Sequence, residues 1–307
     1  MGSDAGLYEK LLPALEKDPG LVYSGPSYLE IEPISECEYK CDFCPRQFTE
    51  VAANQLSLAD IKLVTDFLAN SLDDATVTLG GMGEPLQHDD ILSICEKFLE
   101  AEPLKQLIIE TNGFYLNKLE RLIEHKSFAK VTIIINFNSL ENSSTIHGCP
   151  AENLAKVKAN LSSWSNQLKK RDEKLLKRTY LQVLKVLENE TEVDLLYDLA
   201  DGLGFSFLLQ KYNRYIDLMP ERRVSDMTPL ERYFCWHLRR DMFIRADGDV
   251  SFCKQDISNQ APRGNIRSQS LAEIWQKGEI FFKDNLQNKL AKSPDCANCD
   301  EYFTFNF

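Results

Sequence analysis

The sequence predicts an α/β protein: a partial (β/α)6 TIM-like barrel followed by a small α+β domain. Short β-branched apolar runs alternate with apolar stripes at helical spacing between residues 28 and 210, and this alternation stops near residue 212. Single helices between strands indicate parallel strands joined by right-handed crossovers. Six strands suit an open barrel, whereas a closed barrel of this type has eight.

The elements are expected in a regular order. Strands are predicted at residues 28–34, 75–79, 106–110, 131–137, 180–184 and 205–210, and helices at 57–70, 89–100, 116–125, 151–164 and 193–203. Ser57 and Asp89 are expected as helix N-caps and Gly204 as a helix stop. The charged segment 169–177 is expected to be a solvated helix end or loop. Beyond residue 212 we expect a hairpin around Gly248 and a helix near 271–277.

The predicted domains are an N-terminal helix and linker (1–26), the barrel (27–211) and a C-terminal domain (212–307). The 307 residues include 47 acidic and 35 basic side chains, a net charge of −12, which argues against general binding of nucleic acid or membrane surfaces. No apolar run approaches the roughly 20 residues of a membrane span, and no signal peptide is expected. We therefore expect a cytoplasmic protein, in which nine cysteines need a role other than disulfide formation.

Three of these cysteines follow the first predicted strand directly. Cys37, Cys41 and Cys44 have the spacing C-x3-C-x2-C, which places three thiols at the carboxyl end of the sheet, where ligands of parallel barrels bind. Three thiolates can hold three irons of a [4Fe-4S] cluster and leave the fourth iron open. A zinc site completed by a distant ligand and buried unliganded cysteines are the alternatives.

Residues 36–45, ECEYKCDFCP, resemble the CxxxCxxC loop of radical S-adenosylmethionine (SAM) enzymes, including the aromatic Phe43 before the third cysteine. The resemblance implies that Phe43 lies at a SAM site and that the amino and carboxylate groups of SAM chelate the open iron. It further implies that one electron, from a donor such as flavodoxin or ferredoxin, cleaves SAM to a 5′-deoxyadenosyl radical that takes a hydrogen from the substrate. The cofactor pair supplies the chemistry, and the protein supplies placement and exclusion of water.

Polar or small residues end the next strands and extend the resemblance. The segment 79–85, LGGMGEP, is similar to the glycine-rich GGE-type segment of the family, which implies SAM contacts for Gly81 and Glu84. Further expected SAM contacts, which would otherwise be simple turn or strand-end residues, are Thr111, Asn112, Asn136 and Gln182. Relatives often have Ser and Asp where this chain has Asn136 and Asn138. Lys185 is a candidate for the SAM carboxylate or for catalysis.

A second group of cysteines lies near the C-terminus. Cys235-x12-Gly248-x4-Cys253 followed by Cys296-x2-Cys299 resembles the twitch or SPASM auxiliary-cluster region of radical SAM enzymes. The resemblance implies one auxiliary [4Fe-4S] cluster, as in the sugar-alcohol dehydrogenase subgroup, which oxidises an aminocyclitol. A structural zinc ion is the alternative. Residues 222–241 also resemble the spiro-SPASM group.

Further side chains are candidates for substrate binding or catalysis. A cluster of arginines could bind an anionic substrate through bidentate contacts, or could form surface salt bridges: Arg214, Arg222, Arg223, Arg232, Arg239 and Arg240. His147 and Cys149 are candidates for acid–base or thiol chemistry, and His237 for acid–base chemistry. Cys95 is expected in the core.

Taken with the resemblance, these observations predict a radical SAM enzyme that oxidises a sugar-like or other small anionic substrate. One alternative is a peptide-modifying enzyme that forms a crosslink or thioether, although only some 27 residues precede the first predicted strand, fewer than a peptide-recognition domain needs. The other alternative is an iron–sulfur protein that binds or regulates without turnover.

Overall fold

The computed structural model describes residues 25–71, 74–140, 146, 148, 150–226, 228–229, 232, 234–259, 262–287, 289 and 294–303. The expected N-terminal helix and linker (1–26) therefore lie almost entirely outside the described residues. Within these ranges, no helix is both long enough and apolar enough to cross a membrane.

A single curved sheet organises the described part of the chain. Its strand order is β6-β5-β4-β3-β2-β1-β7-β8-β9, and the strands from β6 to β7 are mutually parallel. The first six are β1 (Tyr28–Ile31), β2 (Ala75–Leu79), β3 (Leu104–Thr111), β4 (Val131–Asn136), β5 (Thr179–Lys185) and β6 (Ser206–Lys211). The predicted partial barrel of six parallel strands is confirmed.

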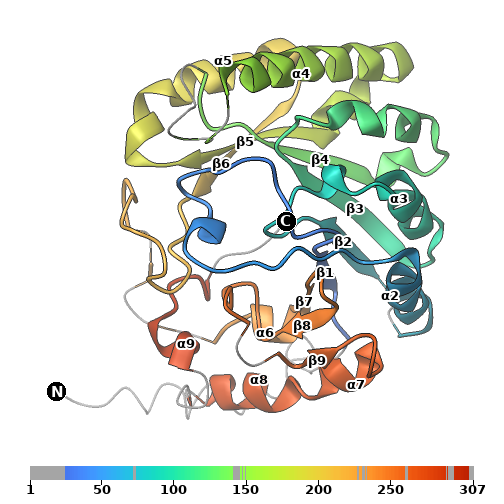
Figure 1. Cartoon of the computed structure of the whole chain (residues 1–307), viewed down its shortest axis with the longest axis vertical. Helices are drawn as coiled ribbons and strands as arrows, with labels where there is room; N and C mark the ends of the chain where they lie inside the picture. Colours follow the sequence, from blue (N-terminus) through green and yellow to red (C-terminus); the bar gives the residue numbers. More distant parts are fainter. Residues whose placement is uncertain are drawn as a thin grey trace.

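Helices cover the convex face of this sheet (Figure 1). The α-helices are α2 (Leu58–Ser71), α3 (Ile91–Glu100), α4 (Ala151–Arg171) and α5 (Val193–Leu203). Short 3-10 helices lie between the strands: η2 (Pro45–Gln47), η3 (Pro85–Gln87), η4 (Leu116–Glu124), η5 (Phe128–Lys130), η6 (Glu173–Arg178) and η7 (Leu187–Glu192). The segment predicted as a helix at 116–125 is therefore a 3-10 helix, and α4 continues seven residues past its predicted end.

Local signals account for most helix boundaries. The Ser57 hydroxyl accepts a hydrogen bond from the Asp60 N–H at 3.1 Å while the Asp60 carboxylate accepts from the Ser57 N–H at 2.9 Å, a reciprocal cap at the start of α2. Gly204 ends α5 with φ of 80°, as expected for a left-handed C-cap. The prediction for Asp89 was wrong: Asp90 is the N-cap of α3, because the Asp90 N–H is held by the His88 ring at 3.0 Å.

The C-terminal part continues the same sheet. After α6 (His237–Arg240), β7 (Asp241–Ile244) pairs in parallel with β1, and β8 (Asp249–Ser251) folds back on β7 through the left-handed Gly248, which confirms the predicted hairpin. The remaining elements are β9 (Gly264–Asn265), α7 (Leu271–Gln276), α8 (Glu279–Leu286) and α9 (Pro294–Asn298). The boundary near residue 212 stays a prediction, and the sheet itself runs across it.

Alternation along the strands separates the core from the barrel interior. Leu29 and Ile31 of β1 are fully buried in the main hydrophobic cluster, which the helices cover. Glu30, between them, points to the opposite face, because successive side chains of a strand alternate. Alternate positions of β1 therefore place polar side chains in the interior of the barrel and apolar side chains beneath the helices.

Candidate functional site

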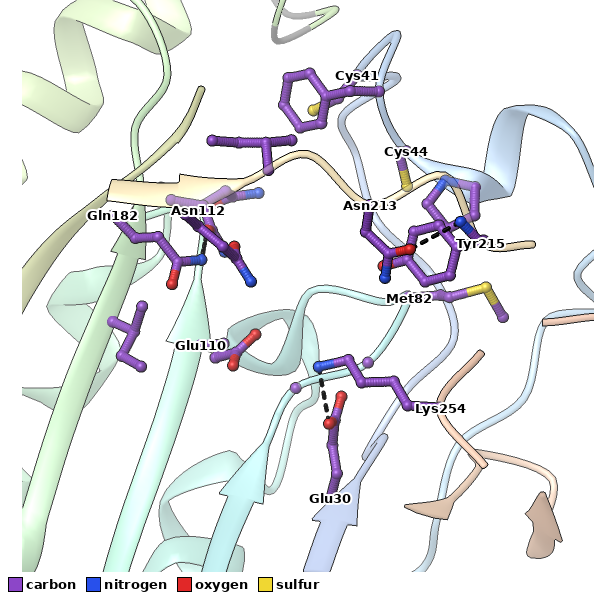
Figure 2. A pocket seen from close by; sticks show the side chains of 18 of the residues that line it. Glu30, Cys41, Cys44, Met82, Glu110, Asn112, Gln182, Asn213, Tyr215 and Lys254 are labelled. Atoms are coloured by element: carbon purple, nitrogen blue, oxygen red, sulfur yellow. Dashed lines mark hydrogen bonds and ion pairs between the residues drawn. The ribbon is translucent and has the colours of Figure 1, made fainter. Parts of the chain in front are cut away.

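A cavity of about 520 Å³ lies at the carboxyl ends of the parallel strands. All three cysteines of the first group, Cys37, Cys41 and Cys44, line it. They come from the loop after β1, where the Cys44 N–H donates to the Cys41 carbonyl at 3.0 Å and Pro45 starts the short helix η2. Figure 2 shows Cys41 and Cys44 at one side of the cavity, with polar side chains from several strands opposite them.

Apart from the candidate Lys185, the residues expected to contact SAM also line this cavity. They are Phe43, Gly81, Glu84, Thr111, Asn112, Asn136 and Gln182. The Gln182 amide donates to the Asn136 side chain at 2.6 Å, and the Asn112 amide donates to Glu38 at 3.0 Å. The structure thus brings together residues that are up to 145 positions apart in sequence, from Cys37 to Gln182. Their contacts with SAM stay predictions.

The glycine-rich loop after β2 is fastened by Glu32, a residue that sequence reasoning did not single out. The Met82 N–H donates to the buried Glu32 carboxylate at 2.8 Å, and Ala246 of the β7–β8 turn donates to it at 3.4 Å. Gly81 has φ of 100°, and a Cβ atom there would lie 2.8 Å from Glu32. Gly81 is therefore required by the backbone as well as by the cavity.

Glu84 is buried, and its carboxylate joins its own loop after β2 to the end of β3. Its carboxylate accepts hydrogen bonds from the Leu86 N–H at 3.0 Å, the Thr111 hydroxyl at 2.7 Å and the Asn112 N–H at 2.8 Å. Burial raises the pKa of Glu84 to about 7, although these hydrogen bonds act in the opposite direction. Most of the accepting capacity of Glu84 is therefore used within the protein, and the side chain shapes the cavity wall.

The floor of the cavity contains charged residues that the sequence did not reveal as a group. Lys254, next to Cys253, extends into the cavity and its Nζ lies 2.9 Å from the carboxylate of the buried Glu30 (Figure 2). Glu110 of β3 lines the same region. The sequence did contain a sign of Glu30: it lies two residues before Glu32, so both side chains point to the same face of a strand whose other residues are apolar. Lys254 had no such signal, because its position depends on how the second domain folds.

The catalytic candidates that the structure describes do not line the cavity. Lys185 is absent from the lining residues and pairs with Glu190 at 3.5 Å. His147 and Cys149 lie outside the described residues. His237 hydrogen-bonds Asp241 at 2.5 Å, and Cys95 is fully buried in helix α3 as predicted. The catalytic roles of Lys185, His147 and Cys149 stay predictions.

The arginine cluster forms ion pairs and other protein contacts. Arg214 pairs with Asp217 at 2.7 Å, Arg222 with Glu188 at 3.2 Å, and Arg223 with Asp300 at 3.1 Å. Arg240 pairs with Asp241, and Arg232 donates to the Cys299 carbonyl at 2.8 Å. None of the six expected arginines is among the residues that line the cavity. The salt-bridge interpretation is therefore favoured over an anion site.

The four cysteines of the second group come from three separate segments. Cys235 precedes α6, Cys253 follows β8, and Cys296 and Cys299 lie in and after α9. Burial raises the pKa of the Cys235 thiol to about 12, and the charges of Cys299 and Cys296 add to the rise. The Cys235 N–H donates to the Asn285 side chain at 2.7 Å, which ties this segment to α8.

Both cysteine groups have features that suit iron–sulfur clusters. Backbone N–H groups approach the sulfurs: Tyr39 that of Cys37, Arg46 that of Cys44, and Glu301 that of Cys299, the last at 3.3 Å. Such N–H···S bonds stabilise cluster thiolates. The donor sets fit cluster ligation.

Two family models match the chain. The model described as the radical SAM superfamily matches residues 31–170, and the model of the SPASM iron–sulfur cluster-binding domain matches residues 235–300. An uncharacterized protein of Treponema pallidum is 40% identical over 126 residues, which are 41% of this chain and 34% of that protein. GTP 3′,8-cyclase of Haemophilus influenzae is 27% identical over 116 residues, 37% of this chain and 34% of the cyclase. The matches thus span about a third of each relative.

Solved structures show the same fold at low identity. BtrN in complex with AdoMet and 2-DOIA has a TM-score of 0.60 and 17% identity, covering 91% of this chain and 94% of BtrN. Streptococcus suis SuiB bound to its precursor peptide SuiA has a TM-score of 0.65 and 16% identity, covering 95% and 73%. The enzyme anSMEcpe with bound AdoMet has a TM-score of 0.61 and 16% identity, covering 90% and 89%.

The cavity at the strand ends, the two cysteine groups and the two matching family models agree. The cofactors of the chain are those that the two matching domains imply, SAM and [4Fe-4S] clusters. The chain belongs to the radical SAM superfamily and has a SPASM iron–sulfur domain at its C-terminal end.

Proposed function

We propose that the chain is an enzyme that cleaves SAM reductively in the cavity and removes a hydrogen atom from a small polar substrate, with net oxidation of that substrate. The observation that carries this proposal is the shared cavity: three cysteines and Phe43 of one loop, and six further expected SAM contacts from four other segments, line the same space. A site for a cofactor and a neighbouring substrate requires such convergence at one end of a barrel.

Within this proposal, the two cysteine groups have separate roles. Cys37, Cys41 and Cys44 would hold the SAM-binding cluster, and Cys235, Cys253, Cys296 and Cys299 the auxiliary cluster. When bound, the first cluster and SAM supply the one-electron cleavage and the hydrogen abstraction, and the auxiliary cluster supplies an acceptor for the second electron of an oxidation.

The residues of the chain position the reactants and limit access of water. Glu32 and Glu84 fix the glycine-rich loop and the end of β3 through hydrogen bonds of 2.7 to 3.4 Å. The Asn136–Gln182 pair presents amide groups of β4 and β5 to the same space. These groups are positioned before ligands bind, so little reorganisation is needed at the reacting centre.

Lys254 supports a connection between the auxiliary site and the substrate. It follows Cys253 directly and reaches the cavity floor, where it pairs with Glu30. The loop that holds one auxiliary ligand therefore also forms part of the cavity wall. This arrangement favours an oxidation in which the auxiliary site lies near the substrate, and it is the main argument for that reaction type.

Modification of a peptide is the second candidate function. It is supported by the structural similarity to SuiB, whose structure contains a precursor peptide. An iron–sulfur protein without turnover is the third. The three differ in products: an oxidised small molecule, a modified peptide, or intact SAM.

Anaerobic reconstitution with iron and sulfide, followed by dithionite and SAM, tests the proposal. We expect 5′-deoxyadenosine from the wild-type chain and none from Cys41→Ala. Cys95→Ala is the matched control, because Cys95 is buried in α3 away from the cavity. Intact SAM in every sample contradicts the enzyme proposal. Deuterium transfer from labelled sugars or peptides into 5′-deoxyadenosine then separates the first two candidates.

A further inference from the structure

The cavity has more acidic than basic lining residues. Among the described residues, the acidic and basic side chains of its wall are Glu30, Glu84, Glu110, Glu301, Lys211 and Lys254. Glu84 already accepts three hydrogen bonds from the protein, and Glu301 pairs with Lys211 at 2.9 Å. Lys254 is therefore the remaining basic side chain of this wall for two carboxylates: it pairs with Glu30, and Glu110 lines the same cavity.

Glu30 lacks some of the hydrogen-bond donors that a buried carboxylate requires. Its side chain is 2% exposed, and neither of its carboxylate oxygens has a hydrogen bond within the described part of the chain. The Lys254 Nζ lies 2.9 Å from one oxygen as an ion pair. The other oxygen is also buried and has no donor among the described residues, although Glu30 lines the cavity. Burial of a carboxylate is unfavourable unless donors or cations surround it, so this position favours a ligand that supplies them.

Glu110 adds a second carboxylate on the same side of the cavity. Inward-facing positions of β1 and β3 bring Glu30 and Glu110 into the barrel interior across β2. Figure 2 shows both side chains and Lys254 directed into one region of the cavity, below Cys41 and Cys44. Gly80 lies between the two strands, and its missing side chain leaves this region open: a Cβ atom there would lie 3.5 Å from the Glu110 carboxylate.

We propose that Glu30 and Glu110 form a subsite for a protonated primary amine of the substrate. The inference rests on the proposed function and narrows its substrate class. An ammonium group donates three hydrogen bonds and neutralises the excess negative charge, whereas a hydroxyl group supplies one donor and no charge. A phosphate or carboxylate would be repelled by the two glutamates, and the six arginines that were expected to attract it do not line the cavity.

Matched fragments measure this preference without knowledge of the true substrate. We suggest two sets, cyclohexylamine with cyclohexanol and cyclohexanecarboxylate, and glucosamine with glucose and glucuronate. Their dissociation constants are measured by ligand-observed NMR on the anaerobic, reconstituted protein with SAM bound and no reductant. We expect each amine to bind at least about tenfold more tightly than its alcohol, with the acid weakest.

Two variants and one control assign the preference to residues. Glu30→Gln and Glu110→Gln should each reduce the ratio of amine to alcohol affinity about tenfold, because each removes one charged acceptor. Glu120→Gln is the matched control: Glu120 is exposed on η4, away from the cavity, and the ratio should not change.

Several results overturn the inference. They are equal binding of amine and alcohol, tightest binding of the acid, an amine preference that persists in both Glu30→Gln and Glu110→Gln, and an amine preference seen only without SAM, which would assign the carboxylates to the SAM ammonium. Addition of dithionite to the same wild-type preparation tests the proposed function separately. Failure to form 5′-deoxyadenosine contradicts that function, whereas normal cleavage without amine preference contradicts only the subsite.

Discussion

Substitution of Gly83 by alanine should separate the glycine-rich loop from the cysteine loop. Gly83 lies against the backbone between β1 and Cys37, and a Cβ atom would overlap the Ile34 carbonyl oxygen and lie 2.7 Å from its carbon. Ordinary contacts of a Cβ atom begin at 3.4 Å, so the carbonyl carbon would have to move by about 0.7 Å and the overlapping carbonyl oxygen by more. Both partners are backbone, so no side-chain rotation relieves the overlap.

The cost follows from what this movement breaks. The Glu84 N–H, next to Gly83, donates to the Glu36 carbonyl at 2.8 Å, and this bond joins the two loops. Loss of one buried hydrogen bond together with an overpacked contact gives about 2–4 kcal/mol of destabilisation. The displaced segment ends at Cys37, so the first cluster should assemble poorly while the auxiliary cysteines keep their positions.

Iron content and thermal unfolding under anaerobic conditions measure both effects. We expect Gly83→Ala to fall from about eight irons per chain to about four and to unfold several degrees below the wild type. Gly202→Ala is the control: Gly202 lies in α5, nothing is within 4 Å of the new Cβ, and alanine favours the helix, so stability should stay equal or rise. A Gly83→Ala protein with full iron and unchanged unfolding would refute the reasoning.

Three further predictions concern separate parts of the chain. Cys253→Ala should lose about four irons per chain yet still form 5′-deoxyadenosine, and retention of all eight would argue against Cys253 as an auxiliary ligand. Thr179→Val should destabilise by about 1–3 kcal/mol in urea unfolding, because the buried Trp164 indole N–H, 3.0 Å from the Thr179 hydroxyl, loses its acceptor; an unchanged midpoint would contradict this. Burial opposes ionisation of Asp60, but hydrogen bonds from Arg267 and Ser57 lower its pKa below 3.8. The pair therefore stabilises the fold above pH 3.8 and loses its effect as pH falls through the lower, folded pKa. Asp60→Asn should cost about 1 kcal/mol at neutral pH, with a difference from wild type that shrinks below about pH 4; a constant difference would be inconsistent with the pair.

Much of the fold was predictable because local patterns agree with the tertiary structure. All six barrel strands were expected within a few residues of their observed positions, since β-branched runs between helical stripes have few other solutions. The capped start of α2 and the glycine stop of α5 were expected as well. The boundary of α3 and the 3-10 character of η4 were not, because helix ends and tight helices depend on neighbours such as the His88 ring.

The candidate site also has features that the sequence predicted and features that it did not. Cysteine spacing is a local property, so the loop at Cys37 indicated its chemistry directly, and the family models agree with it. Strand ends were expected to converge because parallel strands share one carboxyl edge, and the cavity-lining residues follow that rule. The number of arginines suggested an anion site, but the acidic partners that neutralise them lie nearby only in the folded chain.

The sequence by itself determined the barrel, its strand order along the chain and the two groups of cysteines, because each depends on residue type at short spacing. Only the tertiary structure decided which charged groups meet in the cavity. Lys254 and Glu30 are 224 positions apart in sequence, and they pair at 2.9 Å because β7 adds to the edge of β1 and turns the loop after β8 over the barrel. Contacts between distant segments depend on how all strands of the sheet assemble, which no local pattern encodes.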